Sequence, residues 1–105
     1  MSEVTLTAED DGRVVSVRVG SDVTIRLPEN PTTGYRWAIA HLSDQLAIVE
    51  SRFDPPAVAT PGAGGVRVIH LRAHAAGEAR VALLYSRFWQ HEAGTTCQFR
   101  IVINP

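Results

Sequence analysis

Two strand-like runs are joined by a short turn in residues 23–39, which read VTIRLPENPTTGYRWAI. Before the turn every second residue from Val23 to Leu27 is hydrophobic, and after it the same alternation runs from Tyr35 to Ile39. A period of two is typical of half-buried β-strands. This stretch therefore predicts two strands with a tight connection between them, and the rest of the chain extends the same pattern.

The connection itself is the hexapeptide Asn30-Pro31-Thr32-Thr33-Gly34-Tyr35. Proline gives such a turn a rigid start, and glycine supplies a pivot because it tolerates positive φ angles. Two small hydroxyl side chains lie between them. A sequence of this kind often serves only as a structural turn, but we expect this loop to be the functional end of the protein.

Hydrophobic alternation recurs at fairly regular intervals, and no segment predicts a convincing helix. We expect strands at residues 4–6, 15–19, 23–27, 35–40, 46–53, 66–74, 78–85 and 97–103. The dipeptide Asp11-Gly12 predicts a hairpin between the first two strands. Segment 54–65, rich in proline and glycine, and segment 86–96 are expected to be long loops. Seven or eight short strands predict an antiparallel β-sandwich of the immunoglobulin-like type, and a closed barrel is the main alternative.

Composition indicates one globular domain that spans residues 1–105, with 45% hydrophobic and 20% charged residues. The formal net charge is −1 and the charges are mixed, so we expect no nucleic-acid partner, no membrane partner and a monomer. The start of the chain does not resemble a signal peptide, and a single cysteine cannot form an internal disulfide. These features favour a cytoplasmic location, although a secreted or periplasmic protein without its leader would look the same.

Residues that could support catalysis or bind a metal do not form a productive pattern. His70 and His74 would share one face of a strand, but four residues of strand separate them by ~13 Å. Cys97 is in phase with Phe99 and Ile101, so we expect it to be a buried hydrophobic residue and not a nucleophile. The sequence therefore predicts a protein that is not an enzyme and that uses no cofactor or metal.

In a sandwich of the predicted type, alternate connections emerge at the same end of the molecule. The loop at residues 30–34, the loop at 61–65 and the loop at 87–96 are each separated by two connections. We therefore expect these three loops to lie side by side.

Three motifs on these loops together resemble the chagasin-type inhibitors of papain-like cysteine proteases. They are Asn30-Pro31-Thr32-Thr33-Gly34-Tyr35 followed by Trp37, then Gly62-Ala63-Gly64-Gly65, then Arg87-Phe88-Trp89. The order and spacing of the motifs match, and the resemblance covers nearly the whole chain. The family pattern in the third motif is Arg-Pro-aromatic, so Phe88 replaces the usual proline.

The resemblance implies an immunoglobulin-like domain whose three loops form a wedge for the protease cleft. Thr32 and Thr33 would lie over the catalytic cysteine, while Gly62–Gly65 and Arg87–Trp89 would contact the walls on either side. Inhibition would be reversible and competitive, without covalent chemistry. Tyr35 is expected to support the loop, and Arg87 either orients the loop or contacts the protease. The Phe88 substitution keeps one alternative open, a protein- or ligand-binding module without inhibitory activity.

Overall fold

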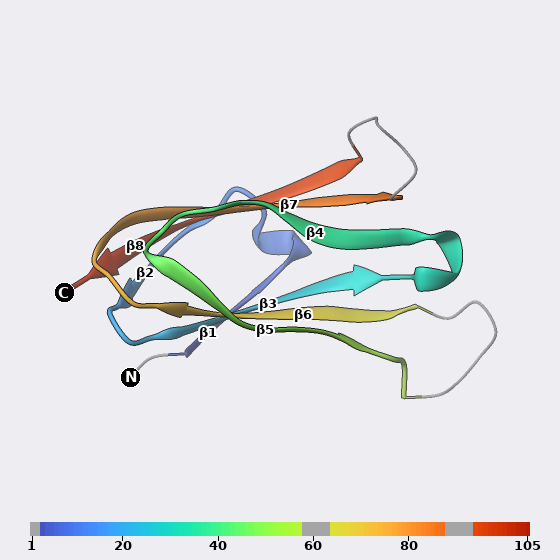
Figure 1. Cartoon of the computed structure of the whole chain (residues 1–105), viewed down its shortest axis with the longest axis horizontal. Helices are drawn as coiled ribbons and strands as arrows, with labels where there is room; N and C mark the ends of the chain where they lie inside the picture. Colours follow the sequence, from blue (N-terminus) through green and yellow to red (C-terminus); the bar gives the residue numbers. More distant parts are fainter. Residues whose placement is uncertain (1–2, 58–63, 88–93) are drawn as a thin grey trace.

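Eight β-strands form two four-stranded sheets that pack face to face, which confirms the predicted sandwich (Figure 1). The computed structural model describes residues 3–57, 64–87 and 94–105. The strands are β1 (Glu3–Thr7), β2 (Val14–Arg18), β3 (Asp22–Glu29), β4 (Tyr35–Leu42), β5 (Leu46–Asp54), β6 (Gly65–Ala73), β7 (Gly77–Arg87) and β8 (Thr95–Asn104). Two single turns of 3-10 helix accompany them, η1 (Ala8–Asp10) and η2 (Pro31–Thr33). Within the described part of the chain, no helix is long and apolar enough to cross a membrane.

One sheet has the strand order β1-β3-β6-β5 and the other has the order β2-β8-β7-β4. The pairs β3–β6, β5–β6, β4–β7 and β7–β8 are antiparallel. The short strands β1 and β2 pair in parallel with β3 and β8. Each sheet is therefore mixed, with an antiparallel body and one parallel strand at an edge.

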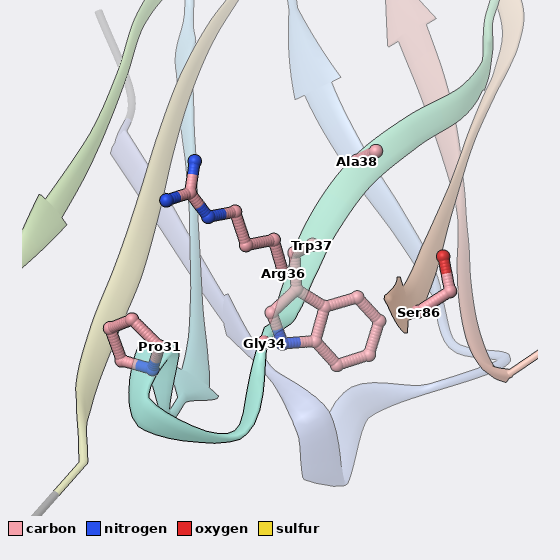
Figure 2. A pocket seen from close by; sticks show the side chains of 6 residues that line it. All are labelled: Pro31, Gly34, Arg36, Trp37, Ala38 and Ser86. Carbon is pink, nitrogen blue, oxygen red and sulfur yellow. The ribbon is translucent and has the colours of Figure 1, made fainter. Parts of the chain in front are cut away.

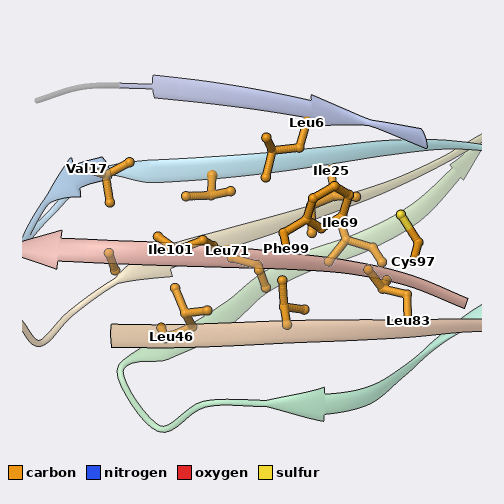
Figure 3. Close-up of a cluster of buried hydrophobic side chains, with 14 of the residues drawn as sticks. Leu6, Val17, Ile25, Leu46, Ile69, Leu71, Leu83, Cys97, Phe99 and Ile101 are labelled. Atoms are coloured by element: carbon orange, nitrogen blue, oxygen red, sulfur yellow. The ribbon is translucent and has the colours of Figure 1, made fainter. Parts of the chain in front are cut away.

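The core fills the space between the two sheets (Figure 3). Ile25 and Ile69, from β3 and β6, are almost fully buried on one side. Leu83 on β7 and Phe99 on β8 are buried on the other. Since side chains alternate between the two faces of a strand, the period-two pattern of the sequence places every second residue in this core.

The predicted hairpin at Asp11-Gly12 is wrong, because β1 and β2 belong to different sheets. The acidic residues before Gly12 serve another purpose. Asp10 Oδ2 accepts a hydrogen bond from the Thr7 N–H at 2.9 Å, which caps η1. Asp11 Oδ1 accepts one from the Gln98 N–H at 2.7 Å, which ties the segment to β8. Side-chain hydrogen bonds of this kind compete with a tight hairpin and turn the chain towards the opposite sheet.

The connections β3–β4, β5–β6 and β7–β8 begin and end at one end of the molecule, which we call the loop end (Figure 1). The strand register confirms this arrangement. Glu29, at the end of β3, lies opposite Gly65 at the start of β6. Tyr35, at the start of β4, lies opposite Arg87 at the end of β7. The prediction that the three loops share one end is therefore confirmed.

Candidate functional site

The loop between β3 and β4 holds its shape through its own hydrogen bonds. Asn30 caps η2, since its Oδ1 accepts from the Thr32 N–H at 3.2 Å and from Thr32 Oγ1 at 2.6 Å. Thr33 Oγ1 donates to the Asn30 carbonyl at 2.7 Å. Pro31 suits the first position of the turn because it has no N–H to satisfy. Gly34 ends the turn with a φ of 83°, a value that favours glycine.

The tip of this loop is open to solvent, because Pro31, Thr32 and Thr33 are all exposed. A hollow of about 480 Å³ lies beside the loop, along the start of β4 and the end of β7. Figure 2 shows the residues that line it, which are Pro31, Gly34, Arg36, Trp37, Ala38 and Ser86. The loop therefore projects beside a surface hollow that leaves room for part of another molecule.

Three aromatic rings support the loop from below. The Tyr85 ring stacks on Tyr35 with centroids 5.2 Å apart and on Trp37 with centroids 4.8 Å apart. The Tyr85 hydroxyl accepts a hydrogen bond from the Asn30 N–H at 3.1 Å. Tyr35 and Trp37 are partly buried, as expected for supporting residues. Tyr85 was missed as a site residue, although it is in phase with the inward-facing Leu83 on the same strand.

Arg87 joins the end of β7 to the loop. Its Nε donates to the Thr33 carbonyl at 2.9 Å, and its guanidinium lies 4.6 Å from the centroid of the Tyr35 ring. A cation over an aromatic face adds attraction to the charge-assisted hydrogen bond. Of the two roles that the sequence left open for Arg87, orientation of the loop is the one with observed contacts.

An ion pair between the buried Glu29 carboxylate and the partly buried Arg67 lies directly beneath the loop. The Glu29 side chain is 1% exposed and bonds Arg67 Nη2 through Oε2 at 2.9 Å. Its other oxygen, Oε1, accepts from Arg67 Nε at 3.2 Å and from the backbone N–H of Trp37 at 2.8 Å. This pair was not predicted from the sequence. The available signal was the phase of Glu29, which continues the inward-facing series of Ile25 and Leu27.

The second loop is described only at its ends, and its two described glycines lie against the protein's own chain. A Cβ on Gly65 would approach the Asp54 carbonyl, and one on Gly64 would lie 3.2 Å from the Glu29 carbonyl. Gly64 thus brings the second loop next to Asn30 at the base of the first. The predicted site residues Gly62, Ala63, Phe88 and Trp89 lie outside the described residues.

Among the described residues, no group of three or more His, Cys, Asp or Glu side chains could hold a metal ion. His70 instead lies 3.3 Å from an Asp22 carboxylate oxygen on the outer face of its sheet. Cys97 is buried as predicted. Burial, followed by the nearby Asp11 carboxylate, raises the pKa of the Cys97 thiol to about 11, so the reactive thiolate is disfavoured.

Comparison with known proteins gives consistent matches along the chain. Residues 16–103 match a family model described as "Chagasin family peptidase inhibitor I42". Chagasin from Trypanosoma cruzi is 32% identical over 103 residues, which cover 93% of this chain and 94% of the relative. The cysteine protease inhibitor EhICP2 from Entamoeba histolytica has a TM-score of 0.89 at 24% identity, with coverage of 98% of this chain and 97% of that one. PbICP-C in complex with falcipain-2 has a TM-score of 0.65 at 16% identity, with coverage of 97% and 88%. The two structural likenesses show the same fold.

Proposed function

Because the chain belongs to the chagasin family of peptidase inhibitors, we propose that it inhibits papain-like cysteine proteases by reversible, competitive blockage of the active-site cleft. Family membership confirms the resemblance noted in the sequence and the prediction that the protein is an inhibitor and not an enzyme. It does not favour the alternative of a binding module without inhibitory activity. The observation that carries the proposal is the family match, and the preformed loop at the shared loop end supports it.

We also propose which residues contact the protease. Pro31, Thr32 and Thr33 would enter the cleft, because small side chains let a narrow loop pass between walls built for an extended peptide. Gly62–Gly65 and Arg87–Trp89 would lie against those walls. Tryptophan and arginine are the residue types most enriched at interface hot spots.

The geometry of the first loop supports a mechanism of occlusion without covalent chemistry. Asn30 and Thr33 fix the loop by hydrogen bonds, and Arg87 holds the Thr33 carbonyl. A loop that is ordered before binding loses less conformational entropy when it docks. Two proteins that share this fold, the cysteine protease inhibitor EhICP2 and PbICP-C bound to falcipain-2, agree with this class of target.

Steady-state inhibition of papain with a peptide substrate tests the proposal. We expect competitive inhibition that is reversed by dilution. Thr33→Trp should abolish it, because an indole cannot follow the loop into the cleft, and the fold should remain. Ala76→Trp is the matched control, since Ala76 is exposed in the turn between β6 and β7, at the opposite end of the molecule. Full papain activity at micromolar wild-type protein would contradict the proposal.

A further inference from the structure

Glu29 is the one charged residue in the described part of the chain whose residue exposure falls to 2%. It is also the last residue of β3, immediately before the loop. Both carboxylate oxygens are engaged, by Arg67 at 2.9 and 3.2 Å and by the Trp37 N–H at 2.8 Å. A buried carboxylate with this set of partners has a fixed position and a fixed orientation.

Glu29 and its partners come from three of the four strand ends that carry the first two loops. Glu29 ends β3, Trp37 lies near the start of β4, and Arg67 lies near the start of β6. Strand β4 is at the edge of its sheet, so alternate N–H groups on it point away from β7. The Trp37 N–H meets Glu29, which belongs to the opposite sheet. One carboxylate therefore ties the two sheets together directly below the loop.

We propose that Glu29, Arg67 and the backbone N–H of Trp37 form a clasp that sets the position of loop 30–34 relative to Gly64 and the start of β6, and that Glu29 is a positioning residue for inhibition. This inference rests on the proposed function. Gly64 lies close to the Glu29 carbonyl and Asn30, so a shift at the end of β3 would be passed to loop 30–34 and to Gly64. The clasp thus controls the geometry of the surface that enters the cleft.

Stability alone is a weak explanation for such a pair. Removing two charges from water is costly, and well-packed apolar residues of similar size often serve a folded protein as well or better. Apolar side chains cannot, however, accept a hydrogen bond, so they cannot fix the position of the Trp37 backbone N–H on β4. Arginine adds a planar fork that binds a carboxylate through two parallel hydrogen bonds, which fixes direction as well as distance. What the clasp supplies is therefore a defined geometry.

The test replaces the clasp with apolar residues and separates geometry from stability. In the double variant Glu29→Leu/Arg67→Met, neither charge is left unpaired, so the protein should remain folded. The control is Asp22→Leu/Arg72→Met. It removes an ion pair with a separation of 3.0 Å that joins the same two strands at the opposite end of the molecule, together with the 3.3 Å contact between Asp22 and His70. We expect the clasp variant to inhibit papain at least tenfold more weakly, and the control to stay within twofold of wild type.

Amide hydrogen exchange of the unbound protein gives a second readout. Exchange at the amides of Trp37, Asn30 and residues 32–34 should accelerate at least tenfold in the clasp variant, beyond any change at core amides such as Leu83. A folded clasp variant with unchanged inhibition and unchanged loop exchange would overturn the inference. If wild-type protein fails to inhibit papain, the proposed function fails, and the exchange data still decide whether the clasp orders the loop.

A milder variant covers the case in which the double variant does not fold. Arg67→Lys keeps the charge opposite Glu29 but cannot form two parallel bonds. We expect a threefold or greater loss of inhibition with folding retained. Inhibition equal to wild type in this variant would count against the clasp.

Discussion

Removing one oxygen atom from Tyr85 tests how the loop is attached to the sandwich. Tyr85→Phe keeps the ring, so the stacking on Tyr35 and Trp37 at 5.2 and 4.8 Å should persist. The variant loses only the hydroxyl that accepts from the Asn30 N–H at 3.1 Å. The perturbation therefore acts on the start of the loop and leaves the aromatic support in place.

The size of the effect follows from this single bond. A neutral hydrogen bond within a protein contributes about 1 kcal/mol net, because the unfolded chain bonds to water instead. We therefore expect the free energy of unfolding to fall by about 1 kcal/mol. For a domain of this length such a change lowers Tm by about 4 °C. If the whole loss appears in the binding geometry, inhibition weakens by up to about fivefold.

Urea denaturation of wild type and variant, followed by tryptophan fluorescence, measures this change. The slope of the transition should stay constant and the midpoint should fall. Tyr35→Phe is the matched control, since the Tyr35 hydroxyl makes no hydrogen bond within the described residues, and its unfolding free energy should stay within about 0.5 kcal/mol of wild type. Equal midpoints for Tyr85→Phe and Tyr35→Phe would refute the attachment.

Three further predictions concern a close approach, a thiol and a carboxylate. Gly65→Ala should destabilise the fold by about 1–3 kcal/mol, seen as a lower urea midpoint, because its Cβ would overlap the Asp54 carbonyl. Iodoacetamide should alkylate Cys97 at pH 8 about 100-fold more slowly than in urea-unfolded protein, since burial raises its pKa to about 11; equal rates would contradict this. The hydrogen bond from the Thr7 N–H, with help from Arg13, lowers the Asp10 pKa, so its contribution to stability is present above the ordinary carboxyl pKa and is lost as the pH falls below it. Asp10→Asn should therefore flatten the acid-side fall in Tm, and an unchanged profile would argue against that role.

Most of the strands could be predicted from the sequence because they bury one face, and β5, in which Leu46 is the one buried residue, is the exception. Alternation from Val23 to Leu27 and from Tyr35 to Ile39 is a local pattern, and the inward-facing positions in the structure follow it. The shared loop end could be predicted for the same reason, since strand direction alternates along the chain. These features depend on short-range order alone.

The features that were missed depend on partners far away in the chain. Asp11-Gly12 resembles a hairpin turn locally, but Asp11 is bonded to Gln98, 87 residues later. Glu29 and Arg67 are 38 residues apart, and the sequence does not show that one will neutralise the other. The phase of Glu29 indicates that its side chain faces inward, yet only the register of β3 and β6 in the folded sheet shows which residue forms an ion pair with it.

The residues assigned to the site by motif divide into two kinds once their contacts are known. Asn30 and Gly34 shape the loop, and Arg87 fastens it from β7. Even the hydroxyl of Thr32 is bonded to Asn30, and that of Thr33 is bonded to the Asn30 carbonyl. Because these polar groups are used within the molecule, the tip offers a partner small volume and fixed shape more than a set of directed hydrogen bonds. If the proposed function holds, such a surface would suit a cleft that many related proteases share, and we expect contacts outside the tip to discriminate between them.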